Sequence, residues 1–170
     1  VGIGIMIDSF RRTVSDWLDH ALRSDIYVSS AADRRGFHRP PLPPDLIRRV
    51  SSAPGVSQVA LVRRQFLESP SGLTELFVMR IPREGFSAFR FLEGNARAAW
   101  EAMRDGAVIV SDPYAYRHGL HQGDVVRLRT DRGVREFPVA GVYSDYGSDQ
   151  GIVGILGETY DRFWADREVD

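Results

Sequence analysis

Residues 107–143 read AVIVSDPYAYRHGLHQGDVVRLRTDRGVREFPVAGVY, and this stretch decides the fold class. Its first residues, AVIVS, form a short apolar run that predicts a buried strand. Asp112 and Pro113 predict a helix with Asp112 as its N-cap, and Gly119 predicts where that helix ends. In the VVRLRT segment that follows, apolar and charged residues alternate, and DRG turns the chain into a second strand. The succession of strand, helix and hairpin predicts a small, partly closed β-barrel.

The residues before this stretch predict a β-α-β-β order followed by a helix. DIYVSS, at 25–30, is rich in β-formers and predicts a strand. A helix is expected from Pro44 to Ser52, because proline is tolerated in a first turn. The runs 56–69 and 72–82 predict the two strands of a hairpin. Asn95 is expected to cap the next helix, which precedes the stretch quoted above.

The amino-terminal residues, VGIGIMIDSFRRTVSDWLDHAL, predict a helix with one apolar stripe. The apolar residues fall at alternating steps of four and three. Its first turns are apolar all round, and a polar face begins only at Asp8. Two interpretations remain open: a membrane span that emerges into water, or the amino-terminal helix of a globular core. The stripe runs through Ile3, Ile7, Phe10, Val14, Trp17 and Ala21.

Composition excludes several classes of function. The chain has 22 basic and 23 acidic residues and a net charge of −1, so it has no overall field to attract nucleic acid. The absence of Cys excludes disulfide and thiolate chemistry. Every basic residue other than histidine is Arg, so the chain has no lysine to form a Walker nucleotide site. If the protein depends on ATP, another domain or subunit must hydrolyse it.

We find no motif for catalysis, metal or cofactor. His118 and His121 could hold a metal, but Gly119 separates them and no established ligand spacing is present. Asp145 and Asp149 could form a carboxylate pair, but Asp, Ser and Gly also build turns for backbone reasons alone. We therefore predict no catalytic residue, no metal and no cofactor.

A proline-rich loop between residues 31 and 44 is a candidate for partner binding. Its prolines exclude a helix and a central strand. A rigid loop loses little entropy on docking, which favours an interaction. The residues expected to meet a partner are Phe37, Pro40, Pro41, Leu42 and Pro43.

Three stretches, VGIGIMIDSFRRTVSDWL, APGV and VIVSDPYAYRHGLHQGDVVRLRTDRGVREFPVAGVYSDYGSDQGIVGI, resemble a known family. It is the extracytoplasmic segment of FtsX-like ABC transporter permeases, the MacB-like periplasmic core domain, which also occurs in LolC and LolE lipoprotein-releasing permeases. The resemblance covers essentially the whole chain. Its most specific part is the order of SDPYA, GLxxGD, TxxG, FxVxGVY and DY. The motif residues, to which we assign structural roles, are Asp112, Pro113, Tyr114, Gly119, Gly123, Asp124, Gly141, Asp145 and Tyr146.

The resemblance implies an α+β fold in which a porter-like β-α-β subdomain carries an inserted, β-barrel-like sabre subdomain. Residues 1–23 would be the end of a transmembrane helix and a stalk helix. Residues 24–83 would be the first half of the porter subdomain, and 84–156 the sabre subdomain. Residues 157–170 would return to the porter subdomain, which in the family continues further, so the chain is expected to be truncated.

The resemblance also implies a mechanical function. A separate cytoplasmic ATPase subunit would drive the transmembrane helices, and the stalk would transmit that movement to a domain on the periplasmic side of the inner membrane. The domain would then export or release a hydrophobic substrate, such as a lipid, lipoprotein or peptide, or engage a periplasmic partner protein. A second permease copy is expected, and the stalk residues expected to contact it are Phe10, Val14, Trp17 and Leu18.

Two other functions remain as alternatives. A free-standing periplasmic ligand-binding module would have a signal peptide and an apolar pocket. A small hydrolase or metal enzyme would use His118, His121, Asp145 and Asp149.

Overall fold

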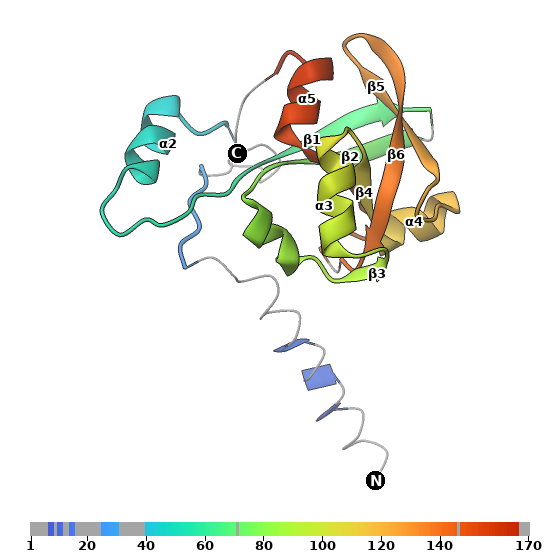
Figure 1. Cartoon of the computed structure of the whole chain (residues 1–170), viewed down its shortest axis with the longest axis horizontal. Helices are drawn as coiled ribbons and strands as arrows, with labels where there is room; N and C mark the ends of the chain where they lie inside the picture. The colour runs from blue at the N-terminus through green and yellow to red at the C-terminus, as the bar shows by residue number, and fades with distance from the viewer. Residues whose placement is uncertain are drawn as a thin grey trace.

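The computed structural model has an α+β architecture, with one curled mixed sheet and helices on its outer face and at its openings (Figure 1). It describes residues 7–8, 10–11, 14–15, 25–30, 40–70, 72–145 and 147–166. The mixed fold predicted from the sequence is confirmed. The helices are α2 (Pro44–Ser51), the 3-10 helix η1 (Arg83–Ala88), α3 (Ala96–Arg104), α4 (Asp112–His118) and α5 (Gly157–Phe163). The strands are β1 (Leu61–Ser69), β2 (Gly72–Arg80), β3 (Phe91–Glu93), β4 (Val108–Ser111), β5 (Val125–Thr130), β6 (Gly133–Tyr143) and β7 (Ile152–Leu156).

The sheet has the strand order β1-β2-β7-β4-β6-β3, with β5 paired to β6. Its neighbours are antiparallel except for the pairs β2–β7 and β4–β6. The long strand β6 pairs with β5 through residues 133–138 and with β4 and β3 through its second half. Because β5 also contacts β1, the sheet curls until its two sides approach each other. A single sheet thus joins strands from the stretches 24–83 and 84–156.

The concave side of the sheet encloses the main core. Alternation along β4 sends Val108 and Val110 inward and Ile109 to the opposite face. Helices α4 and α5 add aromatic rings to this core through Tyr114 and Tyr160. Burial of these apolar side chains is the dominant stabilising term. The other strand residues that pack here are Leu76, Val78, Val126, Leu128, Phe137, Val139, Val142, Val153 and Ile155.

The convex side carries a second core beneath α3 and η1. Met79, Ile109 and Tyr143 reach it from the sheet, and Ala99 and Met103 reach it from α3. Aromatic rings join η1 to its neighbours: Phe86 lies 5.4 Å from the Trp100 ring and 5.9 Å from the Phe91 ring. These edge and tilted contacts are geometries that aromatic pairs prefer.

Several local predictions are confirmed. The hairpin forms from β1 and β2, and α2 begins at Pro44. Asn95 caps α3 with its side-chain oxygen, which accepts a hydrogen bond of 2.9 Å from the Ala98 N–H. All four residues of β4 are buried. Gly119 ends α4 in the left-handed conformation, with φ +62°.

Two local predictions need correction. The cap of α4 is Ser111 rather than Asp112, and Asp112 is the first helical residue. The Asp112 carboxylate accepts a hydrogen bond from the Asp145 N–H, so the fold uses it for a distant loop. Residues 25–30, predicted as a strand, have no strand pairing. The short elements η1 and β3 had no sequence signal that we recognised.

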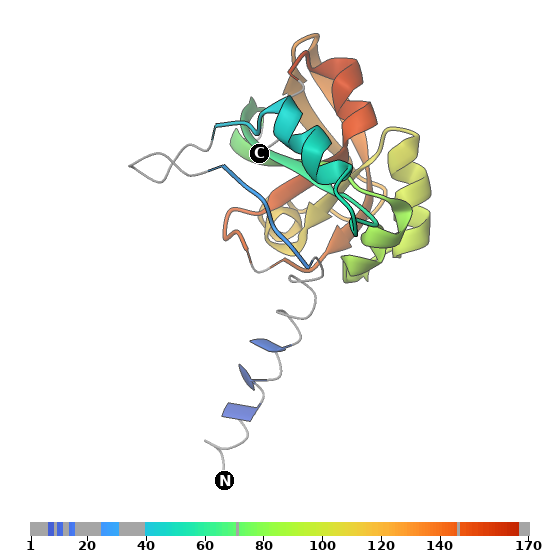
Figure 2. The same ribbon diagram turned by 90° about the vertical axis from the view of Figure 1, so that its left-hand side faces the viewer.

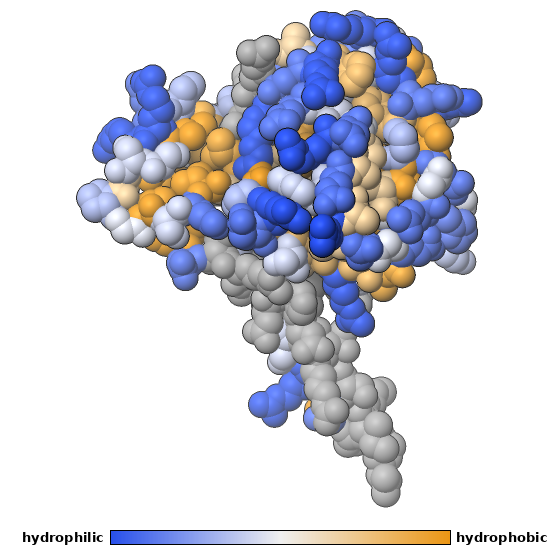
Figure 3. Space-filling model, viewed as in Figure 1, coloured by the Kyte–Doolittle hydropathy of each residue, from blue (hydrophilic) through white to orange (hydrophobic). Residues whose placement is uncertain are grey.

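The amino-terminal segment stands away from the sheet. The six residues described between Ile7 and Ser15 are all helical, and they lie below the body in both ribbon views (Figures 1 and 2). No helix within the described ranges combines the length and apolarity that crossing a membrane requires. Helix α2 lies at the side of the body with no fully buried residue, and hydrophobic residues show between its outer edge and the body (Figure 3).

Candidate functional site

The motif residues gather around α4 and the loop of residues 144–151, an arrangement we call the motif cluster. Asp112 Oδ1, in the first turn of α4, accepts a hydrogen bond of 3.0 Å from the Asp145 N–H. Asp145 Oδ1 in turn accepts one of 3.0 Å from the Gly147 N–H. Its second oxygen, Oδ2, is buried without a hydrogen-bond partner within the described chain. Both carboxylates therefore fix backbone groups. Asp149, the other member of the carboxylate pair considered from the sequence, takes part through its carbonyl oxygen, which accepts a hydrogen bond from Arg117.

The same loop is pressed against the helix at its other end. Gly151 has φ +81°, and a Cβ built there would lie 2.2 Å from the Tyr114 N atom. Only glycine allows this approach. Arg117, one turn further along α4, donates to the Asp149 carbonyl oxygen at 3.1 Å and to the Gln150 side chain. The loop is thus held along the length of α4.

The turn after α4 is fixed to β6. The Gly123 N–H donates to the Val139 carbonyl at 2.9 Å, and the Val139 N–H donates to the Asp124 carbonyl at 2.8 Å. The Asp124 carboxylate accepts a hydrogen bond of 2.7 Å from the His121 N–H. On the next part of β6, Gly141 leaves room for the Glu93 carbonyl, which would lie 2.7 Å from a Cβ.

Glu93 and His121 form an exposed ion pair between β3 and this turn. The Glu93 Oε1 atom lies 2.8 Å from His121 Nδ1, and Oε2 accepts a hydrogen bond of 2.9 Å from the Gln122 N–H. The hydrogen bond from Gln122 and the one to His121 lower the pKa of Glu93. The hydrogen bond to Glu93 and its charge raise the pKa of His121. The ion pair is therefore strongest at pH values between the two pKa values, where Glu93 is deprotonated and His121 is protonated.

The two histidines of the sequence hypothesis lie in separate environments. The His118 ring packs 4.3 Å from the Tyr114 ring, and burial followed by the Arg117 charge lowers its pKa. His121 instead pairs with Glu93. Within the ranges that the structure describes, no three His, Asp or Glu side chains are grouped as metal ligands. The contacts of the two histidines hold α4 and the turn after it in place.

The candidate partner loop is described only from Pro40 onward, and Phe37 lies outside the described residues. Pro40 and Pro43 are exposed, and Pro41 and Leu42 are half-buried. Pro43 precedes α2, and its carbonyl accepts a hydrogen bond of 2.9 Å from the Leu46 N–H. The loop therefore enters α2 directly.

Of the four stalk residues, Phe10 and Val14 are described. Phe10 is 70% exposed, and Val14 is partly buried. Trp17 and Leu18 lie outside the described residues, as does the motif residue Tyr146.

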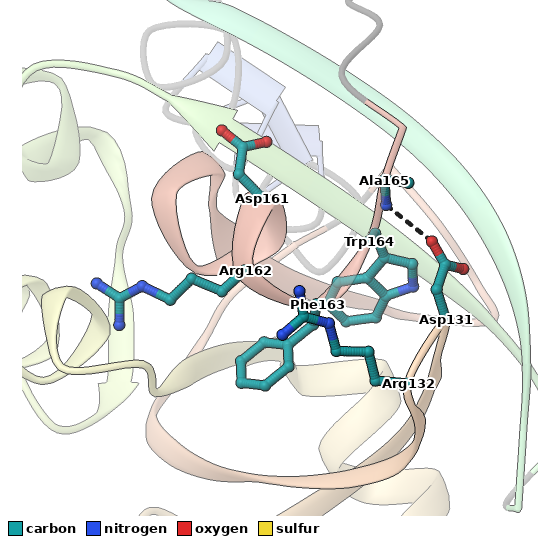
Figure 4. Close-up of a pocket in the computed structure, with 7 residues that line it drawn as sticks. All are labelled: Asp131, Arg132, Asp161, Arg162, Phe163, Trp164 and Ala165. Atoms are coloured by element: carbon teal, nitrogen blue, oxygen red, sulfur yellow. Dashed lines mark hydrogen bonds between the residues drawn. The ribbon is translucent and has the colours of Figure 1, made fainter.

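A hollow that the sequence gave no reason to expect lies between the β5–β6 turn and the end of α5 (Figure 4). Its volume is about 330 Å³, and it is lined by Asp131, Arg132 and residues 161–165. Asp131 Oδ2 closes one side by accepting a hydrogen bond of 2.7 Å from the Ala165 N–H (Figure 4).

Comparison with known proteins adds two findings. Residues 1–166 match the family described as the MacB-like periplasmic core domain. The chain is also 33% identical, over 174 residues, to an uncharacterized ABC transporter permease protein of Mycobacterium tuberculosis. That alignment covers 99% of this chain and 20% of the relative, so the chain spans about a fifth of the relative's length.

Proposed function

The chain belongs to the MacB-like periplasmic core domain family, and from this premise we propose that it is the extracytoplasmic domain of an ABC transporter permease. The permease would lie in the inner membrane with this domain on its periplasmic side. A separate cytoplasmic subunit would bind and hydrolyse ATP, and the domain itself would not be an enzyme. Its task would be to couple movement of the transmembrane helices to the export or release of a hydrophobic substrate, or to a periplasmic partner.

The observation that carries this proposal is the apolar stripe of the amino-terminal helical segment. Ile7 and Phe10 are 59% and 70% exposed, although their spacing places them on one helical face with Val14. An apolar face without a core behind it is suited to contact with another molecule. The segment also stands away from the sheet, which supports a role as a stalk (Figure 1). We propose that the stripe packs against the stalk of a second permease copy.

Cysteine cross-linking in the full permease tests this contact. This chain contains no Cys, so Phe10→Cys introduces a single thiol into the domain. Two stalks that pack through the stripe should give a cross-linked dimer whose yield changes between the nucleotide-free and ATP-bound states. Ser15→Cys is the matched control, since Ser15 is exposed and lies off the stripe. Equal yields of cross-linked dimer from Phe10→Cys and Ser15→Cys would exclude the stalk contact. So would a yield from Phe10→Cys that is the same in the nucleotide-free and ATP-bound states.

A second variant tests the coupling itself. Trp17→Asp places a charge on the predicted stripe. It should leave the domain folded and ATP hydrolysis intact while export by the permease falls. Normal export by this variant would contradict the coupling role of the stripe.

A further inference from the structure

Three arginines form an exposed cationic surface at the end of the molecule where the β5–β6 turn meets α5. We call Arg132, Arg135 and Arg162 the arginine patch. All three are exposed, and none makes a side-chain hydrogen bond or ion pair within the part of the chain that the structure describes. Hydrophilic residues dominate this end of the molecule (Figure 3).

The acidic side chains nearby are already engaged. Asp131 accepts the hydrogen bond from the Ala165 N–H, and Asp161 pairs with Arg80 at 2.6 Å. Glu136 pairs with Arg127 at 2.9 Å. Asp131 keeps its negative charge, but the three arginines outnumber it, so the patch is locally positive although the chain as a whole has a net charge of −1. Unpaired guanidinium groups favour a partner that brings carboxylates, which they bind bidentately.

An aromatic ring lies beside the patch. In Figure 4 the guanidinium group of Arg132 lies next to the Phe163 ring, whereas the Arg162 side chain extends away from that ring. Phe163 is held by an edge contact to Phe137, with centroids 5.5 Å apart at 89°. Arg135 shares a face of β6 with Phe137, two residues along the strand, which places it on the same side of the β5–β6 hairpin.

The hollow beside this ring is lined by aromatic side chains that pack against other rings. Its floor includes Trp164, whose ring stacks on Tyr160 at 4.9 Å and 7°. A volume of about 330 Å³ lies at the lower end of the range of ligand sites. A partner could therefore place one apolar side chain in the hollow while its flanking charges meet the arginines.

The position of the patch decides between a membrane and a protein as the source of the negative charge. The described residues of the stalk segment lie on the opposite side of the body from α5 (Figure 1). If the stalk emerges from the membrane, as the proposed function requires, the patch faces away from the lipid surface. This step rests on the proposed function, and the other steps do not.

From these observations we propose that the arginine patch and its hollow are a docking site for an acidic segment of an extracytoplasmic partner protein, which inserts one apolar side chain beside Phe163. The carboxylates of that segment pair with Arg132, Arg135 and Arg162. The contact is polar at its rim and aromatic at its centre, which is the common anatomy of protein interfaces.

The test is an NMR titration of the full chain with a short synthetic peptide in which glutamates flank a central phenylalanine. Amide shifts confined to the β5–β6 turn and the end of α5, with an affinity that falls as salt is added, are expected. Arg135→Glu and Arg132→Glu should each weaken binding about fivefold, because each replaces an ion pair by a repulsion. Arg129→Glu is the matched control, since Arg129 is exposed on the other face of the same hairpin, opposite Val134.

Two further probes complete the test. A peptide with serine in place of the phenylalanine should bind more weakly, because the hollow stays empty. Equal loss in Arg129→Glu and Arg135→Glu, or no shift at these amides, would overturn the proposal. Binding of phosphatidylglycerol vesicles in place of the peptide would overturn it too and would assign the patch to a membrane. Because the assay uses the isolated chain, its outcome is independent of the stalk cross-linking result.

Discussion

Replacing Gly151 by alanine should separate the 144–151 loop from α4. Gly151 has φ +81°, and its added Cβ would lie 2.2 Å from Tyr114 N and 2.6 Å from Tyr114 Cα. These are backbone atoms at the start of a helix, so rotation of a side chain cannot relieve the clash. The loop or the helix must move, and Tyr114, which is 2% exposed, would move with it.

Two terms make up the expected loss of stability. Placing a Cβ on a residue with positive φ costs about 1–2 kcal/mol. Forcing extra volume into a packed site costs about 1–3 kcal/mol more. Gly106→Ala isolates the first term, because Gly106 has φ +105° and a Cβ there would meet no atom within 4 Å. Gly151→Ala should therefore lower the free energy of unfolding by about 1–3 kcal/mol more than Gly106→Ala does.

Urea unfolding followed by circular dichroism measures both variants in the same buffer. For a chain of this size, each kcal/mol corresponds to about 2–4 °C in Tm, so thermal unfolding gives a second readout. Equal losses in Gly151→Ala and Gly106→Ala would refute the close approach of the loop to α4. A larger loss in Gly151→Ala than in Gly106→Ala, together with exposure of Tyr114 to solvent, would support it.

Two other substitutions test the local contacts. Asn95→Ala should lower the free energy of unfolding by about 1 kcal/mol, because it removes the cap of α3, and Asn95→Ser should restore most of it in urea titrations. The pKa of His121 is raised above 6.5, so its pairing with Glu93 stabilises the fold fully below that pH and is lost as pH rises through the folded pKa. The pKa of Glu93 is lowered from 4.5, so its contribution is lost as pH falls through the folded pKa. The stability difference between the parent and His121→Ala should therefore be larger near about pH 6 than near about pH 8, and Glu93→Gln should abolish that dependence.

The sequence predicted best those elements whose signals are local. Asn95 at a cap, Pro44 in a first turn and Gly119 at a helix end act within a few residues of themselves. The hairpin of β1 and β2 follows from two β-rich runs joined by a short turn. Such features depend little on the rest of the chain, so a single sequence is enough to place them.

The failures come from contacts between distant residues. Asp112 has the chemistry of an N-cap, but its carboxylate accepts a hydrogen bond from the N–H of Asp145, 33 residues later. The N-cap position of α4 is occupied by Ser111 instead. The side chain of Ser111 in turn accepts a hydrogen bond of 2.8 Å from the Ile152 N–H. The parallel pairing of β2 with β7 has no local signal either. Tertiary context overrides propensity at these places.

The arginine patch escaped the sequence analysis for a different reason. A net charge of −1 averages over the whole chain and hides a local excess. Arg132 and Arg162 are 30 residues apart and line one hollow only because α5 ends beside the β5–β6 turn. Arg127, which alternates with apolar residues in the same hairpin, is neutralised by Glu136. Only the structure distinguishes paired arginines from unpaired ones.

The residues that carry the family resemblance differ in kind from those we assign to partners. Four of the motif residues form hydrogen bonds with backbone groups, and these bonds hold α4 and its neighbouring loops in place. They are Asp112, Gly123, Asp124 and Asp145. Function on a shared fold resides in the sites added to it. Within the residues that the structure describes, the stalk stripe and the arginine patch make no such backbone bonds through their side chains, and none of their residues is among the nine motif residues. Exchange of Arg132, Arg135 and Arg162 should therefore change the choice of partner while leaving the fold intact, whereas a change at Asp112 should loosen the fold first.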